Sequence, residues 1–115
     1  MSQHSGLSIE RWRSFSASQR ILMIANEMQR GRNALKLGEV ESARLGYERV
    51  LRLVDLTVAV TARTGLLREL LRWRDLVAEL YLAEAPDLQH HEEVERCLLL
   101  LDPVASAQLV PLGLA

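Results

Sequence analysis

Residues 66–85 read LLRELLRWRDLVAELYLAEA and contain neither glycine nor proline. Apolar side chains recur in them at three- and four-residue spacing, which is the spacing of one face of an α-helix. One face carries Leu66, Leu70, Trp73, Val77, Leu80 and Tyr81, and the adjoining face carries Leu67, Leu71, Ala78 and Leu82. A helix that is apolar over so much of its circumference has to be covered by other helices. These residues therefore predict an all-helical protein with a central helix that Pro86 ends.

Three further long helices are predicted around this one, over residues 19–37, 39–62 and 88–101. Their expected core positions are Ile21, Ile24, Ala25, Met28, Gly31 and Leu35, then Val40, Ala43, Tyr47, Val50, Leu51, Val54 and Val58, then Leu88, His91, Val94, Leu98 and Leu101. A short helical start is expected over residues 7–15, with Ser18 as the N-cap of the helix that follows. Gly38 can adopt the left-handed conformation that ends a helix, and Asp87 suits an N-cap. Gly31 is expected to permit a close approach of two helices.

The composition agrees with a single domain over residues 1–115. Of these residues 49% are hydrophobic but only 4% aromatic, with 6 glycines and 3 prolines, so aliphatic side chains fill the core and turns are few. Short connections between four helices predict an antiparallel up-and-down four-helix bundle. Residues 1–7 and 111–115 are expected to be poorly ordered. The uncharged apolar C-terminal tail, Val104 to Ala115, is expected to lie in a groove of this chain or of a neighbouring molecule.

The cellular location follows from the cysteine content and from the absence of long apolar stretches. A single cysteine, Cys97, cannot form a disulfide within the chain and favours a reducing compartment. Residues 1–10 lack the basic and apolar regions of a signal peptide. No stretch approaches the roughly 20 apolar residues of a membrane-spanning helix. We therefore expect a cytoplasmic protein without a membrane span.

The net charge of −1 hides a polarised distribution. Residues 1–74 hold 13 basic and 7 acidic side chains, a net charge of +6, and residues 75–115 hold 1 basic and 8 acidic ones, a net charge of −7. The two regions could pair with each other, pair with a second copy, or attract a charged partner. The arginines between positions 63 and 74 alternate with Glu69 and Asp75, which is typical of a solvated helix face. No nucleic-acid partner is therefore expected.

No pattern typical of catalysis or metal binding is present. His90, Glu93 and Cys97 share one helical face, but they lack the paired spacing of zinc sites. Cys97 lies two helical turns from His90, which is too far for that imidazole to activate the thiol alone. Neither a nucleophile elbow (G-x-S-x-G) nor a glycine-rich phosphate loop occurs. The sequence predicts a protein with no enzymatic activity, no cofactor and no metal.

Three segments follow one another in an order typical of a known family. Residues 15–24 read FSASQRILMI, an aromatic residue before a short Ser-Ala segment and an apolar run. Residues 34–41 read ALKLGEVE, a helix–glycine–acid–helix turn, and residues 70–101 hold a leucine-rich helix, a capping Asp87, a Glu-Val-Glu segment and a leucine run. Over about residues 15–101 the chain resembles the flagellin-specific export chaperones (the FliS family). The resemblance implies a helical bundle that masks an amphipathic, export-prone segment in a hydrophobic groove.

The second and third long helices carry more apolar surface than one four-helix core requires. The surplus side chains are Leu45, Leu53, Leu56 and Val60 on the second helix and Leu67, Leu71 and Leu82 on the third. We expect them to bind an amphipathic helix of a partner protein, as a non-enzymatic chaperone or adaptor would. Two alternatives remain. One is a structural homodimer that uses the same side chains and has no client. The other is a tetratricopeptide-like interaction module, because Gly31, Ala43 and Tyr47 have that repeat's spacing.

Overall fold

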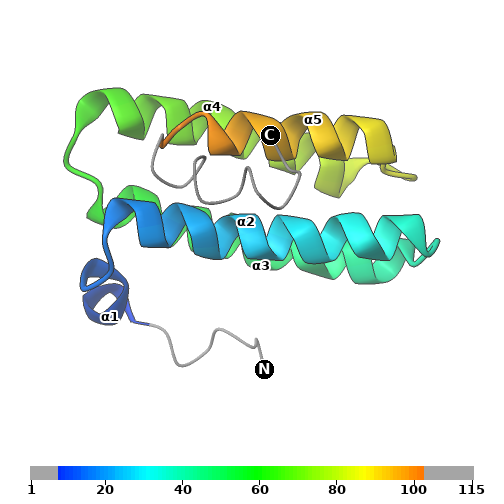
Figure 1. The fold of residues 1–115 in the computed structure, drawn as a ribbon, viewed down its shortest axis with the longest axis horizontal. Helices are drawn as coiled ribbons and strands as arrows, with labels where there is room; N and C mark the ends of the chain where they lie inside the picture. The colour runs from blue at the N-terminus through cyan, green and yellow to red at the C-terminus, as the bar shows by residue number, and fades with distance from the viewer. Residues whose placement is uncertain (1–7, 103–115) are drawn as a thin grey trace.

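The computed structural model describes residues 8–102, which form five α-helices and no strand. The helices are α1 (Ile9–Arg13), α2 (Ala17–Lys36), α3 (Val40–Val60), α4 (Thr64–Leu82) and α5 (Leu88–Leu99), as Figure 1 shows. The prediction of an all-helical fold is confirmed for this part of the chain. The expectations for residues 1–7 and for the tail from Val104 to Ala115 concern residues outside the described range. Between residues 8 and 102, no helix combines the length and the apolar character needed to cross a membrane.

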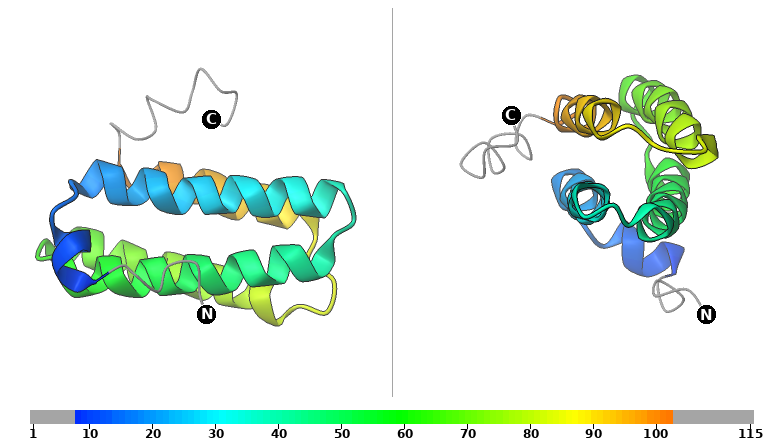
Figure 2. Two further views of the ribbon diagram at one scale, coloured as in Figure 1. Left: turned by 90° about the horizontal axis from the view of Figure 1, so that it is seen from below. Right: turned by 90° about the vertical axis from the view of Figure 1, so that its right-hand side faces the viewer.

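The four long helices surround one core. Helix α2 packs against α3 and α5, and α4 packs against the same two helices (Figure 2). Arg44 in the first turns of α3 donates to the carbonyl oxygen of Ala83, just after α4 ends. Ser18 at the start of α2 donates to Asp102, just after α5 ends. In Figure 1, α2 and α4 run from left to right, whereas α3 and α5 run from right to left.

Helix α1 is short and lies against α3. Ser8 caps it, because its hydroxyl oxygen accepts a hydrogen bond from the backbone N–H of Arg11. Trp12 is completely buried, and its indole Nε1 donates to the hydroxyl oxygen of Thr57 at 2.9 Å. Thr57 in turn donates to the carbonyl oxygen of Leu53 at 2.8 Å. A single tryptophan therefore fixes α1 on one side of α3.

Helix α2 begins two residues before the predicted start, and the prediction of Ser18 as its N-cap is wrong. The N-cap is Ser16, whose hydroxyl oxygen accepts from the backbone N–H of Gln19 at 3.1 Å. The side-chain oxygen of Gln19 accepts from the backbone N–H of Ser16 at 2.8 Å. This capping box satisfies two backbone donors at once, so the helix starts at Ala17. The hydroxyl of Ser18 instead donates to Asp102.

The predicted helix end at Gly38 and the predicted N-cap at Asp87 are both confirmed. Gly38 has a φ of 73°, the left-handed conformation that ends α2. Asp87 caps α5, because its carboxylate accepts from the backbone N–H of His90. Helix α4 differs from its prediction at both ends. It begins at Thr64, two residues before the predicted start, and it ends at Leu82, before the predicted residue 85.

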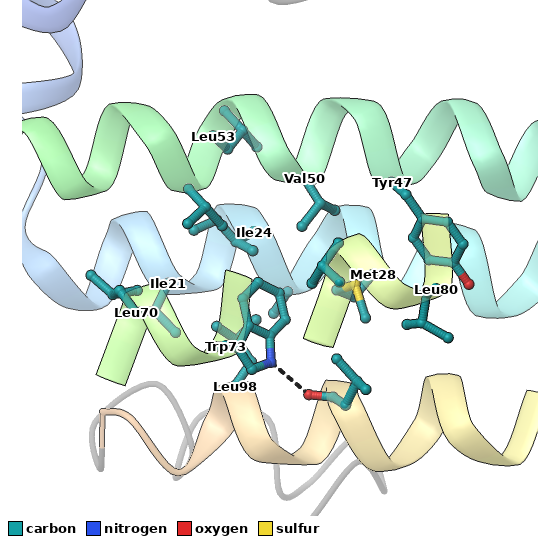
Figure 3. Close-up of a cluster of buried hydrophobic side chains, with 14 of the residues drawn as sticks. Ile21, Ile24, Met28, Tyr47, Val50, Leu53, Leu70, Trp73, Leu80 and Leu98 are labelled. Atoms are coloured by element: carbon teal, nitrogen blue, oxygen red, sulfur yellow. Dashed lines mark hydrogen bonds between the residues drawn. The ribbon is translucent and has the colours of Figure 1, made fainter. Parts of the chain in front are cut away.

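The core between the long helices is mainly aliphatic, with Trp73 and Tyr47 among its largest members (Figure 3). The indole Nε1 of Trp73 donates to the carbonyl oxygen of Val94 at 2.8 Å, which joins α4 to α5. The buried apolar side chains of the long helices are Ile21, Ile24, Ala25, Met28, Ala43, Tyr47, Val50, Leu53, Val54, Leu70, Trp73, Val77, Leu80, Val94, Leu98 and Leu99. A Cβ atom at Gly31 would lie 3.0 Å from Cε1 of His91. The predicted close approach at Gly31 is therefore confirmed, between α2 and α5.

Candidate functional site

The seven side chains that the sequence predicted to bind a partner differ in their exposure. Leu45, Leu71 and Leu82 are exposed, whereas Leu56, Val60 and Leu67 are half-buried. Leu53 is only 1% exposed and belongs to the core. It lies one turn before Thr57, to which Trp12 of α1 is bonded. Because α1 covers this side of α3, Leu53 is not available to a partner, and its assignment to a binding surface is wrong.

Leu67 and Leu71, two of the α4 residues predicted to bind a partner, border the contact between α4 and α3. Leu67, Leu71 and Arg74 recur at four- and three-residue spacing, so they share one side of α4. The guanidinium Nε of Arg74 donates to the carboxylate of Asp55 on α3 at 2.7 Å. Leu67 and Leu71 therefore lie toward α3, away from the side of α4 on which Trp73 reaches α5.

A hollow of about 500 Å³ lies on that other side, between the first half of α4 and the last turns of α5. We call it the α4–α5 groove, and its lining residues are Arg63, Gly65, Leu66, Glu69, Arg72, Trp73, Leu76, Cys97, Leu100 and Leu101. Leu66, Trp73 and Leu76 come from one side of α4, because their spacing follows the helical repeat. Cys97 and Leu100 come from the outward side of α5. Most of the lining is apolar.

Trp73 in this groove is buried, whereas Cys97 and Leu100 are open to solvent. Leu100 is 78% exposed, and the thiol of Cys97 is exposed as well. Arg72 pairs with Glu69 at 3.0 Å, but both side chains are largely exposed, so the pair contributes little to stability. Arg63 forms no ion pair with the described residues. The groove thus combines an apolar floor with positively charged side chains at its edge.

The sequence did not foresee a group of polar side chains that is buried between α2, α3 and α5. The ring atom Nε2 of His91 lies 2.8 Å from the carbonyl oxygen of Met28, and Nδ1 lies 2.7 Å from the hydroxyl of Tyr47. Burial lowers the pKa of His91 and raises that of Tyr47. Because both ring nitrogens are occupied and the ring is fully buried, the imidazole holds three helices together and cannot reach a substrate. A histidine and a tyrosine among predicted core positions were the only signal for this arrangement.

Glu95 lies next to this group and is 2% exposed. Its closest cation is Arg32 of α2, whose Nε lies 3.8 Å from the carboxylate oxygen Oε1. Neither carboxylate oxygen accepts a hydrogen bond from the described residues. Burial raises the pKa of Glu95, and the positive charge of Arg32 opposes that rise. The carboxylate is therefore a costly group inside the α2–α5 contact.

The residues considered for a metal site do not form one. Cys97 lines the α4–α5 groove, whereas the backbone N–H of His90 is bonded to the capping Asp87 at the start of α5. Across residues 8–102, no three histidine, cysteine, aspartate or glutamate side chains are grouped so that they could hold a metal ion.

Comparison with models of protein families, with curated proteins and with solved structures finds no match to this chain.

Proposed function

We propose that this chain is a non-enzymatic adaptor, or export-chaperone-like protein, that binds an amphipathic helix of a partner protein in the α4–α5 groove. The observation that carries the proposal is an apolar hollow of about 500 Å³ with Leu100 78% exposed beside it. Burying one leucine side chain contributes about 1.5–3 kcal/mol. A partner that covers Leu100 and fills the hollow would therefore gain several such contributions.

The shape of the groove favours a helix as the occupant. Its α4 wall extends from Leu66 to Leu76, a rise of about 15 Å or three helical turns. A third helix that lies along two others inserts side chains from positions i, i+3, i+4 and i+7. A partner segment with an apolar face over three turns would match the length of the groove.

The scaffold and the sequence resemblance support the same function. The contacts between helix ends, Arg44 with Ala83 and Ser18 with Asp102, support an antiparallel up-and-down four-helix bundle. Such bundles build binding sites between adjacent helices. The resemblance to flagellin-specific export chaperones supports a cytoplasmic protein that shields an apolar segment of its client.

The proposal is tested with a synthetic peptide that carries leucine at i, i+3, i+4 and i+7, and with a control peptide in which the same residues are scrambled. Binding is measured by fluorescence anisotropy of the labelled peptide and by protection of Cys97, the only cysteine, from a thiol reagent. We expect saturable binding of the amphipathic peptide only, together with slower modification of Cys97.

Two leucines with equal exposure provide a matched pair of variants. Leu100 and Leu82 are each 78% exposed, but only Leu100 lines the groove. Leu100→Ser should weaken binding about tenfold, which corresponds to about 1.4 kcal/mol, and Leu82→Ser should leave it unchanged. The opposite result would place the site on the predicted surface of α3 and α4. A tight dimer that binds neither peptide would reject the proposal in favour of a structural homodimer.

A further inference from the structure

The outward surface that α4 and α5 share carries opposite charges at its two ends. On α4, Gly65, Arg68, Arg72, Leu76 and Glu79 recur at three- and four-residue spacing and so form one stripe. On α5, Glu93, Cys97 and Leu100 recur at four- and three-residue spacing and form a second stripe. Members of both stripes line the α4–α5 groove. The stripes therefore continue the groove along the two helices.

The groove lies at the basic end of this surface. Arg63 directly precedes α4, Arg68 and Arg72 lie in its first half, and all three are exposed. Glu69 pairs with Arg72 and compensates one of these charges. Arg63 and Arg68 form no ion pair within residues 8–102. This end therefore keeps a net positive charge.

The acidic side chains of this surface are Glu93 on α5 and Glu79 on α4. Helices α4 and α5 run in opposite directions in Figure 1. Leu100 and Leu101 lie near Leu66 at the groove, whereas Val94 is bonded to Trp73, two turns further along α4. Moving back along α5 from Leu100 to Glu93 therefore follows α4 from Leu66 to about Trp73, and Glu79 lies further along α4 in the same direction. Both carboxylates are exposed and have no ion-pair partner in the described part of the chain.

We propose that this charge order selects a partner helix with acidic side chains in its first turns and basic side chains in its last turns, bound parallel to α4. This inference rests on the proposed function and adds the charge pattern and direction of the partner. From Arg63 to Glu79 the surface extends about 24 Å along α4, so both ends of a helix of about 16 residues would meet it. The same charge order is favourable within the helix itself, because acidic residues stabilise the N-terminus of a helix and basic residues its C-terminus.

The experiment compares two synthetic peptides that share one leucine face and differ only in charge order. One peptide has glutamates before and lysines after the apolar residues, and the other has the reverse order. We expect the glutamate-first peptide to bind about fivefold more tightly at low ionic strength, since an exposed ion pair contributes up to about 1 kcal/mol. In about 1 M salt, where the Debye length is about 3 Å, the preference should disappear.

Charge-reversal variants separate recognition from the helicity of the free peptides. Arg72→Glu and Glu93→Arg change exposed side chains, and the double variant exchanges the two charges. The double variant leaves both the basic and the acidic group without net charge, because Arg63, Arg68 and Glu79 keep their charges. It should therefore abolish the preference between the two peptides, whereas a difference in peptide helicity would persist. Arg52→Glu, an exposed position on α3, should preserve the original preference.

The outcomes distinguish the two proposals. Equal affinity for both peptides, or a preference that the double variant does not alter, would overturn the charge-order inference and leave the helix-binding function in place. Binding of neither peptide to any variant would reject the helix-binding function itself.

Discussion

The hydroxyl of Tyr47 on α3 lies 2.7 Å from Nδ1 of His91 on α5, and both side chains are fully buried. The other ring nitrogen, Nε2, lies 2.8 Å from the carbonyl oxygen of Met28. A carbonyl oxygen can only accept a hydrogen bond, so Nε2 carries the ring proton of the neutral imidazole. Nδ1 is then the acceptor, and Tyr47 donates to it. The burial that lowers the pKa of His91 stabilises the same neutral form.

Tyr47→Phe is expected to lower the free energy of unfolding by about 1–3 kcal/mol. The substitution leaves Nδ1 of a buried imidazole without its donor, and an unsatisfied buried acceptor costs that amount. Urea unfolding followed by circular dichroism measures the change. Tyr81→Phe is the control, because the hydroxyl of Tyr81 reaches only Glu48, at 3.3 Å on the surface. Its effect should stay within about 0.5 kcal/mol, and equal losses in both variants would contradict the assigned role of Tyr47.

His91 is expected to make stability depend on pH in mildly acidic solution. Its pKa in the folded protein lies below the ordinary value of 6.5, so the unfolded chain binds more protons in that window. Its contribution to stability is therefore complete above about pH 6.5 and falls as the pH decreases toward the folded pKa, by at most about 1.4 kcal/mol per pH unit.

Urea unfolding at a series of pH values tests this dependence on His91. His91→Gln should remove this part of the slope, and His90→Gln, a change at the neighbouring half-exposed position, should retain it. An unchanged slope in the His91 variant would show that another group causes the acid sensitivity.

Glu95→Gln is expected to raise the free energy of unfolding at neutral pH by about 1 kcal/mol. The carboxylate is buried without a hydrogen bond, and its separation of 3.8 Å from Arg32 is too long for one. Its pKa in the folded protein is raised by burial. Its contribution to stability is therefore complete below the unfolded value of about 4.5 and is lost as the pH rises through the folded pKa. This direction is opposite to that of His91.

Unfolding at pH 7 compares Glu95→Gln with Glu93→Gln, an exposed change on the same helix that should have almost no effect. Destabilisation by Glu95→Gln would mean that attraction to Arg32 outweighs the burial of the carboxylate.

The features that could be predicted from the sequence are those that depend on residues close together in the chain. The four long helices, the turn at Gly38 and the cap at Asp87 follow from apolar spacing and from short-range capping, which a single segment encodes. The N-cap at Ser18 was wrong because two residues compete as caps, and the bond between Gln19 and Ser16 decides between them.

The binding surface was predicted less well, because helical periodicity identifies an apolar face but not what covers it. Leu53 was assigned to a partner although α1, a helix of five residues, covers that side of α3. The α4–α5 groove depends on the distance between two helices, which Trp73 and the carbonyl oxygen of Val94 fix. Its residues Leu66 and Trp73 were assigned to the core. The spacing of residues along one helix gives no information on the distance between two helices.

Gly31→Ala is expected to destabilise the protein although alanine favours a helix by about 1 kcal/mol. The added Cβ would lie 3.0 Å from Cε1 of His91, and the ring is held through both nitrogens. The ring can move away only by lengthening or bending one of these hydrogen bonds. Gly65→Ala is the control, because its Cβ would meet no atom within 4 Å. Thermal unfolding should show a lower midpoint temperature for Gly31→Ala and an equal or higher one for Gly65→Ala. A higher midpoint for both variants would mean that His91 and α5 shift to accommodate the added methyl group.

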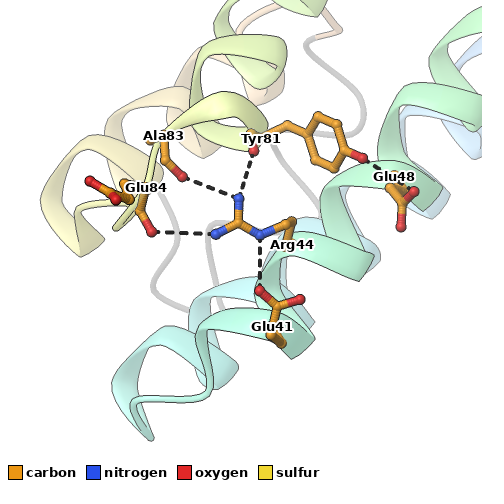
Figure 4. Close-up of polar contacts among 6 residues, drawn as sticks. All are labelled: Glu41, Arg44, Glu48, Tyr81, Ala83 and Glu84. Atoms are coloured by element: carbon orange, nitrogen blue, oxygen red, sulfur yellow. Dashed lines mark hydrogen bonds and ion pairs between the residues drawn. The ribbon is translucent and has the colours of Figure 1, made fainter.

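Arg44 of α3 caps the C-terminal end of α4. Arg44→Met is therefore expected to lower the free energy of unfolding by about 1–2 kcal/mol. Figure 4 shows its guanidinium donating to the carbonyl oxygens of Tyr81, Ala83 and Glu84, while Nε donates to Glu41. These carbonyls have no partner within the helix, and charged donors bind them strongly; partial exposure of the site reduces the loss. Arg52→Met is the control. It removes an exposed arginine of α3, the helix that also carries Arg44, and should change the free energy of unfolding by less than about 0.5 kcal/mol. Hydrogen exchange should accelerate at residues 82–88 in Arg44→Met alone, and unchanged protection there would mean that Pro86 suffices to end the helix.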